Sequence, residues 1–193
     1  GSLAAAAGGF TAVIAEPNTI PPIDTPKRLR NLLDMAGKKC IIHFYSNAAI
    51  TVKTLGGRLT DIARLKEAGA KAISDDGNPV PGHRLMQNAL MKGKECGILV
   101  SPHCEESALY RERMLRRQGK LRQRSSWFPM PFSPRARPYT SEDAFIKRDV
   151  ELAEKVGARI HISHVSLAKS VEIISKARRR GVQVTAEATP HHF

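Results

Sequence analysis

The feature that most constrains the fold is a series of glycines, each placed where a helix-like segment ends and an apolar run begins. The intervals between them are 28, 32, 28, 60 and 24 residues. Four of these match one strand-plus-helix unit of about 30 residues. Glycine favours a left-handed cap at the end of a helix, so we expect each to close one. The sequence therefore predicts a βα repeat with one insertion, punctuated by Gly9, Gly37, Gly69, Gly97, Gly157 and Gly181.

The apolar runs that follow these glycines are predicted to be strands. Several are continuously apolar rather than alternating, which is typical of parallel strands covered on both faces. The six predicted strands are residues 11–16, 40–45, 71–74, 98–101, 159–163 and 182–187. The predicted helices are residues 26–36, 59–68, 84–96, 142–156 and 168–180, and a helix-like segment at 2–7 precedes the first strand.

Alternating strands and helices imply a parallel sheet with right-handed crossovers, either open and doubly wound or closed into a barrel. An open sheet that binds a nucleotide normally has a glycine-rich loop after its first strand, but residues 16–19 read EPNT and no GxGxxG or GxxxxGK occurs. A TIM-type barrel has eight strands over about 250 residues. We therefore expect residues 1–193 to form one α/β domain, an incomplete (β/α)8 barrel with about six of its eight units. The first and last strands of such a barrel are expected to be missing.

Positive charge is concentrated in one segment. The chain has 31 Lys and Arg against 18 Asp and Glu, a net charge of +13. Nine of the basic residues lie between Arg111 and Arg137 with the single acid Glu112, inside an insertion at about 109–139 that is rich in proline and contains Trp127. We interpret this insertion as a solvated arm and loop over the barrel mouth. RNA stacking, a partner surface and attraction of an anionic substrate are the alternatives, and nucleic-acid binding is not favoured because the charge excess is local.

The start of the chain and its cysteines bear on the compartment. The uncharged run at residues 2–14 is broken by Gly8 and Gly9 and is too short to cross a bilayer, and no secretory signal pattern is present. No CxxC pair occurs. We therefore expect a cytoplasmic chain with no membrane partner, in which the cysteines are small buried apolar residues: Cys40, Cys96 and Cys104.

Polar side chains follow the predicted strands, at the edge where a parallel barrel builds its active site. Imidazoles and carboxylates among them are the ligands of divalent transition-metal sites. Alternation along each strand puts Asp76, His103 and His164 on interior faces, whereas Asp75 and His161 fall on opposite faces unless a bulge intervenes. We predict the first three as metal ligands. An ordinary turn and hydrogen-bonded core histidines are the alternative readings. The full set of strand-end residues is Asn18, Asn47, Asp75, Asp76, His103, His164, His191 and His192.

Several segments resemble type I dihydroorotases of the amidohydrolase superfamily, and they occur in family order. They are residues 1–24 with the Pro-Asn-Thr motif, AISDDG at 72–77, HCE at 103–105, HISHVS at 161–166 and VTAEATPHH at 184–192. The resemblance implies an amidohydrolase-type barrel. It also implies a hydrolase of pyrimidine biosynthesis that reversibly converts L-dihydroorotate to N-carbamoyl-L-aspartate.

The resemblance further implies two zinc ions, with Asp76 as the bridging carboxylate and His103 and His164 as ligands of the second ion. It implies that Asn18 helps to bind the carboxylate of the substrate. Related hydantoinases typically have a carboxylated lysine at the bridging position, so Asp-Asp-Gly favours the dihydroorotase branch. The family's His-x-His pair and proton-transfer aspartate belong to strands that this chain does not contain. No catalytic residue is therefore assigned here, and these residues alone are expected to be catalytically incomplete.

Two other functions stay open at this stage. One is another cyclic amidohydrolase, namely a hydantoinase, dihydropyrimidinase or allantoinase. The other is a non-catalytic, dihydroorotase-like scaffold subunit. The expected partners are the small-molecule substrate and either a second copy of the protein or aspartate transcarbamoylase. His191 and His192 match the family pattern but receive no role, and Glu16 stands where the family often has methionine.

Overall fold

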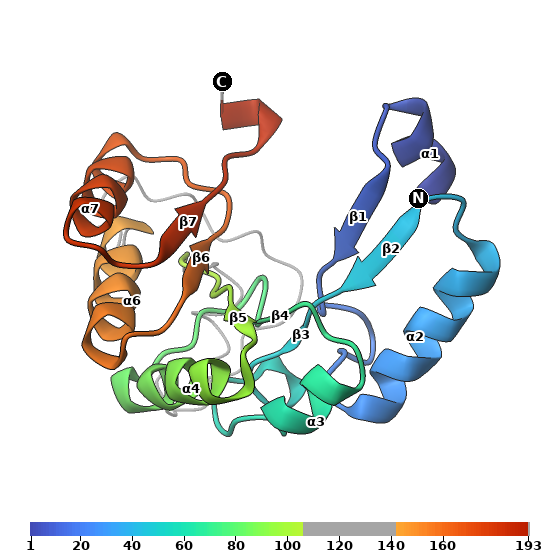
Figure 1. Ribbon diagram of the computed structural model, residues 1–193, viewed down its shortest axis with the longest axis horizontal. Helices are drawn as coiled ribbons and strands as arrows, with labels where there is room; N and C mark the ends of the chain where they lie inside the picture. The colour runs from blue at the N-terminus through green and yellow to red at the C-terminus, as the bar shows by residue number, and fades with distance from the viewer. Residues whose placement is uncertain (106–141, 193) are drawn as a thin grey trace, which may run out of the picture.

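A computed structural model describes residues 1–105 and 142–192, which contain seven short strands with helices between most of them (Figure 1). Every paired strand is parallel, which confirms the predicted α/β class. The strands are β1 (Ala12–Ala15), β2 (His43–Ser46), β3 (Ala48–Ala49), β4 (Ala72–Ser74), β5 (Leu99–Val100), β6 (Ile160–Ile162) and β7 (Val184–Ala186). The helices are α1 (Ser2–Ala7), α2 (Pro26–Lys39), α3 (Ile62–Glu67), α4 (His83–Cys96), α6 (Glu142–Val156) and α7 (Ala168–Arg179), with 3-10 turns η1 (Val52–Thr54) and η2 (Pro190–His192).

The strands form two sheets rather than one. β1 pairs with β2, while the other five strands follow the order β3–β4–β5–β6–β7. The strand predicted at 40–45 begins only at His43 and is followed after Asn47 by β3, a strand that the sequence did not predict. At this point the backbone changes partners, because the amide of Asn47 donates to Ala15 O at 2.9 Å and that of Ala49 donates to Ile23 O at 2.8 Å. Figure 1 shows β1 and β2 standing apart from the larger sheet.

The helix boundaries test the glycine pattern. α6 spans the predicted residues, and five of the six glycines adopt positive φ as expected. The prediction that Gly37 closes a helix is wrong, because α2 continues through it to Lys39, where basic residues favour the negative end of the helix dipole. The helix predicted at 59–68 is also shorter. It begins after Asp61, whose carboxylate accepts a hydrogen bond from the Arg64 amide at 3.1 Å and caps α3.

The hydrophobic core lies between the five-stranded sheet and its helices. All three residues of β4 are buried, and α6 packs against both α4 and α7. No residue of β1 or β2 belongs to this core, and Ile14 on β1 is 56% exposed. The expectation that the strands are covered on both faces is therefore confirmed for β4, but it fails for the smaller sheet and for β7, where Thr185 and Ala186 are exposed.

Two further expectations concern the basic insertion and the membrane. The basic insertion at about 109–139, including Trp127, lies outside the described residues. Within the part of the chain that is described, no helix combines the length and apolar character needed to cross a membrane.

Candidate metal centre

Three strand ends bring one potential metal ligand each to the same place. Asp76 follows β4, His103 follows β5 and His164 follows β6, and one ligand atom from each lies within 4.8 Å of the others. The two imidazole nitrogens, Nδ1 of His103 and Nε2 of His164, are 3.0 Å apart. They lie 3.6 and 3.8 Å from Oδ1 of Asp76. The three residues singled out by strand alternation thus meet, although they are far apart in sequence.

These distances and donor types fit a divalent transition-metal ion. Two ligands about 2.1 Å from a tetrahedral zinc ion lie roughly 3.4 Å from each other. The three observed separations bracket that value. Between 11% and 25% of each side chain is exposed, so the cluster is shielded and still reachable from solvent. Two nitrogens and a carboxylate oxygen are ligands that zinc accepts.

The neighbours of Asp76 favour the ionised form of its carboxylate, the form that binds a metal ion. The imidazole of His103 is the main influence that lowers the pKa of Asp76, and His164 adds to it, so together they outweigh the opposing effect of burial. Oδ2 of Asp76 accepts a hydrogen bond from Nδ2 of Asn18 at 2.5 Å. Asn18 lies in the loop after β1, so this contact joins the smaller sheet to the candidate site.

The neighbouring candidates that strand alternation set aside lie elsewhere. Asp75 is 1% exposed, and its carboxylate accepts hydrogen bonds from the amide of Thr51 at 3.0 Å and from the Thr51 hydroxyl. Burial raises the pKa of Asp75 to about 6. His161 contacts Thr185 Oγ1 at 2.7 Å, and its Nε2 lies 3.6 Å from Glu187. Both side chains therefore bond to other residues of the protein and do not join the cluster of Asp76, His103 and His164.

The backbone at His164 is unusual. Its φ is +44°, in the left-handed region that residues other than glycine rarely adopt. Such a conformation is strained, and it persists only where surrounding contacts hold it. No sequence signal marks this conformation, because HISHVS contains no glycine or asparagine that would indicate a left-handed position.

Glu16 and Asn47 form a second polar group at the ends of β1 and β2. Nδ2 of Asn47 donates to Oε1 of Glu16 at 2.8 Å, while Oε2 of Glu16 and Oδ1 of Asn47 are buried with no hydrogen-bond partner among the described residues. Burial is the main cause of the raised pKa of Glu16, and the negative charges of Asp76 and Glu187 add to it. The sequence identified Glu16 only as a departure from the family pattern, so its electrostatic link to Asp76 was missed.

The cysteine beside His103 is a packing residue. Cys104 is 1% exposed, and burial, with the nearby Asp149 carboxylate, raises the pKa of its thiol well above the usual range. A thiol that stays protonated is a poor nucleophile and a poor metal ligand. This agrees with the expected burial of Cys104, while Cys40 and Cys96 are only partly buried.

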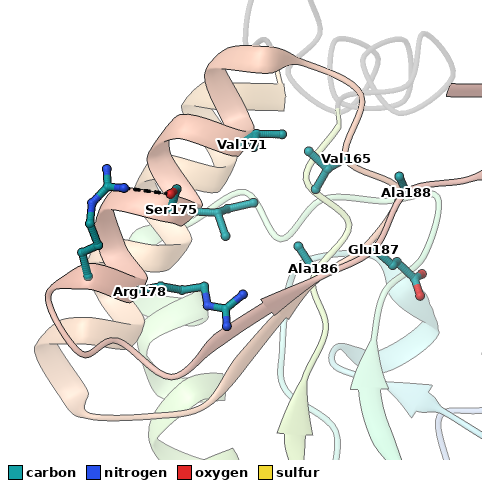
Figure 2. A pocket seen from close by; sticks show the side chains of 9 residues that line it. Val165, Val171, Ser175, Arg178, Ala186, Glu187 and Ala188 are labelled. Atoms are coloured by element: carbon teal, nitrogen blue, oxygen red, sulfur yellow. Dashed lines mark hydrogen bonds between the residues drawn. The ribbon is translucent and has the colours of Figure 1, made fainter. Parts of the chain in front are cut away.

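A cavity of about 600 Å³ lies apart from the three ligands, between α7 and β7 (Figure 2). Val171 and Arg178 of α7 line one side of it, and Ala186 and Glu187 line the other. None of the residues that line this cavity is a candidate ligand, and only Val165 adjoins one in sequence. The candidate site is therefore defined by the side-chain cluster.

Parallel βα units with imidazoles and a carboxylate gathered at their strand ends define the class of this chain as part of a (β/α) barrel with a candidate metal site. Solved structures support the fold. The L-hydantoinase (dihydropyrimidinase) from Arthrobacter aurescens matches with a TM-score of 0.75 and 22% identity, over 98% of this chain and 42% of that chain. A D-hydantoinase (dihydropyrimidinase) from Thermus sp. matches with a TM-score of 0.69 and 21% identity, over 99% and 41%. The described elements thus form part of such a barrel.

Sequence comparisons identify the family. The model of the Dihydro-orotase-like family matches residues 1–170. Proteins named dihydroorotase from Geotalea daltonii and Geobacillus sp. strain WCH70 are each 39% identical over all 193 residues, and one from Syntrophus aciditrophicus is 40% identical. The chain belongs to the dihydroorotase-like family. It spans 43–44% of the length of these curated relatives.

Proposed function

We propose that the protein containing this chain is a dihydroorotase, which reversibly hydrolyses L-dihydroorotate to N-carbamoyl-L-aspartate in pyrimidine biosynthesis. The observation that carries the proposal is the convergence of Asp76, His103 and His164 at three successive strand ends. Family membership supports it, because the relatives that match the whole chain at 39–40% identity are named dihydroorotases.

In this proposal Asp76, His103 and His164 would hold zinc, and the family resemblance implies that Asp76 would be the bridging carboxylate. When bound, the metal polarises an amide carbonyl and lowers the pKa of a water ligand to about 7. The protein side chains supply the geometry. His103 and His164 present neighbouring nitrogens 3.0 Å apart, and the lowered pKa of Asp76 keeps its carboxylate ionised at neutral pH.

Asn18 is proposed to bind the carboxylate of the substrate. Its amide nitrogen is a donor that suits a carboxylate oxygen, and it already lies 2.5 Å from Asp76 Oδ2. A substrate held by Asn18 would therefore lie next to the metal ligands. No described residue of this chain is assigned the proton transfer.

The wider properties belong to the same proposal. Residues 1–193 would form one partial barrel domain that includes the basic insertion at about 109–139. The protein would be cytoplasmic, and it would act as a homodimer or together with aspartate transcarbamoylase. The partners rest on the family resemblance, whereas the domain and the compartment rest on the sequence pattern.

A second candidate is a related cyclic amidohydrolase. The hydantoinase structures that share the fold favour it. Asp76 argues against it, because the resemblance implies a carboxylated lysine at that position in hydantoinases. The 39% identity to dihydroorotases also exceeds the 22% identity to the hydantoinase.

The decisive experiment uses the intact protein and offers it L-dihydroorotate, hydantoin and dihydrouracil in parallel. We expect ring opening of dihydroorotate, its loss after chelation and its recovery on addition of Zn²⁺. Turnover of hydantoin or dihydrouracil without dihydroorotate would establish the second candidate instead. Absence of turnover with all three, combined with binding to aspartate transcarbamoylase, would identify a scaffold subunit.

A further inference from the structure

Helix α6 touches all three segments that carry the candidate metal ligands. It packs between α4 and α7 (Figure 1), and two of its carboxylates and one arginine contact the segments that carry the candidate ligands. These are Glu142, Arg148 and Asp149. Because none of the three is near a ligand in sequence, their contacts depend on tertiary packing.

Glu142 holds the segment that follows His164. Its carboxylate accepts hydrogen bonds from the amide of Ser166 at 2.9 and 3.1 Å, from the amide of Leu167 at 3.2 Å and from the hydroxyl of Ser166. Glu142 is only 8% exposed. Burial alone would raise the pKa of Glu142, but the bonds from Ser166 and the two amides outweigh it, and the net pKa is lowered. The carboxylate is therefore ionised when it binds this segment.

Asp149 and Arg148 hold the other two segments. Oδ2 of Asp149 accepts a long hydrogen bond from the thiol of Cys104 at 3.7 Å, next to His103. Oδ1 of the same carboxylate accepts from Nε of Arg148 at 2.7 Å, and Nη1 of Arg148 donates to the carbonyl oxygen of Pro81 at 3.2 Å. Pro81 lies between Asp76 and α4. One buried ion pair thus links the segments after β4 and β5.

The strained backbone of His164 is the reason why such anchoring matters. A left-handed residue other than glycine relaxes unless its surroundings fix it. The four hydrogen bonds of Glu142 fall on the second and third residues after His164. Held at Ser166 and Leu167 on one side and by β6 on the other, the chain at His164 has little freedom to relax.

We propose that helix α6 positions the two imidazoles of the candidate metal centre, Glu142 by clamping the segment after His164 and the Arg148–Asp149 pair by bracing the segment after β5, which carries His103, against the segment after β4. This inference rests on the proposed metal site. It assigns Glu142 as a positioning residue that acts through Ser166 and Leu167. A simpler role for Glu142 is to cap the start of α7, where a carboxylate stabilises the helix dipole. Only the positioning role predicts that substitution of Glu142 changes metal binding.

The test compares two variants of α6 in the intact protein. Glu142→Gln removes the charge of the clamp. Glu154→Gln is the matched control, because Glu154 also joins α6 to the end of α7, through two contacts with Arg180 at 2.8 and 2.7 Å, but touches no ligand segment. Each protein is titrated with Co²⁺, and its visible absorption and thermal unfolding are recorded.

We expect Glu142→Gln to weaken Co²⁺ binding about tenfold and to alter the visible spectrum, as loss of a supporting contact around a metal typically does. Glu154→Gln is expected to keep the affinity and spectrum of the wild type even where its unfolding temperature falls. Wild-type affinity and spectrum in Glu142→Gln would overturn the proposal and leave only the helix cap. If Glu142→Gln does not fold, Ser166→Ala removes one contact of the clamp. A smaller loss of affinity in the same direction would then support the proposal, and an unchanged affinity would overturn it.

The two proposals fail in different ways. A wild-type protein that binds no Co²⁺, or that keeps its Co²⁺ affinity in His103→Ala, would overturn the metal centre and the positioning role together. A wild-type protein that binds Co²⁺ through His103, while Glu142→Gln and Ser166→Ala bind it equally well, would overturn the role of α6 alone.

Discussion

The two sheets differ in how well they are covered, and the candidate site draws on both. β4 in the larger sheet is fully buried, whereas the residues of β1 are alternately exposed and half-buried. The three potential metal ligands follow strands of the larger sheet, while Asn18 and Glu16 follow β1. Groups that must keep a fixed geometry are better placed on rigid, packed elements. The difference therefore separates a side proposed to hold the metal from a side proposed to contact the substrate.

Several contacts join the two sides, among them the hydrogen bond that the amide of Lys71 donates to Ser46 O at 3.0 Å. Asn18 reaches Asp76 at 2.5 Å, and the backbone connection between the sheets passes through Asn47. Asn47 also bonds to Glu16 at 2.8 Å. Because Asn18 and Asp76 both follow strand ends, the two sheets also meet at the candidate site. Substitutions on the two sides should then have distinct effects on stability and on metal binding.

The largest expected effect concerns packing, and it is tested by the same substitution on each side. Ile73 on β4 is fully buried, whereas Ile14 on β1 is 56% exposed. We expect Ile73→Ala to reduce the free energy of unfolding by about 2–5 kcal/mol, because it leaves a cavity. Ile14→Ala should cost less than about 1 kcal/mol, within the range of strand preferences. Urea unfolding of the intact protein measures both, and equal losses would show that β1 is as well packed as β4.

The next effect concerns metal affinity. His103→Ala removes a proposed ligand from the larger sheet, and His43→Ala is the control because His43 is an exposed residue of β2. We expect His103→Ala to weaken Zn²⁺ binding at least 100-fold, about 2.7 kcal/mol. His43→Ala should leave the affinity unchanged. Calorimetric titration with Zn²⁺ measures both affinities. Comparable losses of affinity in the two variants would contradict a metal site on the larger sheet.

Local signals explain which parts of the fold the sequence predicted. α6 was predicted at its true boundaries because acidic residues mark its start and Gly157 its end. The division between β2 and β3 escaped prediction, since an apolar run contains nothing that tells where a strand changes partners. The prediction that Gly37 closes a helix was wrong for a related reason. A glycine near a helix end is compatible both with a cap and with one more helical turn.

The candidate site was likewise predictable only in part. Strand alternation was sufficient to choose Asp76 over Asp75, because residues one apart face opposite sides of a sheet. The contacts of Glu142 with Ser166 and of Asp149 with Cys104 were beyond reach, since they join residues 24 and 45 positions apart and depend on how α6 packs. The left-handed backbone of His164 was equally hidden. Sequence alone therefore predicted the proposed ligands but not what holds them.

A smaller effect, opposite in sign on the two sides, is expected for two helical glycines. A Cβ on Gly93 in α4 would lie 2.6 Å from Cγ2 of Val100 and 3.1 Å from the carbonyl oxygen of Ile98, whereas a Cβ on Gly37 in α2 would meet nothing within 4 Å. We expect Gly93→Ala to destabilise the protein by about 1–3 kcal/mol through overpacking. Gly37→Ala should stabilise it by about 0.5–1 kcal/mol, because alanine loses less backbone entropy in a helix. Thermal unfolding checks both signs, and a stabilising Gly93→Ala would show that α4 and β5 are loosely packed.

The smallest expected effect is a pair of opposite pH dependences in the metal-free protein. Burial and the charge of Asp76 raise the pKa of Glu16 above its ordinary 4.5, so folding favours its protonated form. Its stabilising contribution is complete below pH 4.5 and is lost as the pH rises through the raised pKa. Glu16→Gln should therefore gain stability relative to the wild type between pH 4.5 and 7.

Glu142 should show the reverse. Despite its burial, the hydrogen bonds from Ser166 and Leu167 lower the pKa of Glu142 below 4.5, so folding favours the ionised form. Its contribution is present above pH 4.5 and is lost as the pH falls through the lowered pKa. Glu142→Gln should thus be most destabilising near neutral pH and approach the wild type in acid. Urea unfolding at a series of pH values, with EDTA present, gives both curves. If the stability of both variants relative to the wild type changed with pH in the same direction, folding would shift the pKa values of Glu16 and Glu142 in the same direction. The two sides would then not differ in their electrostatics.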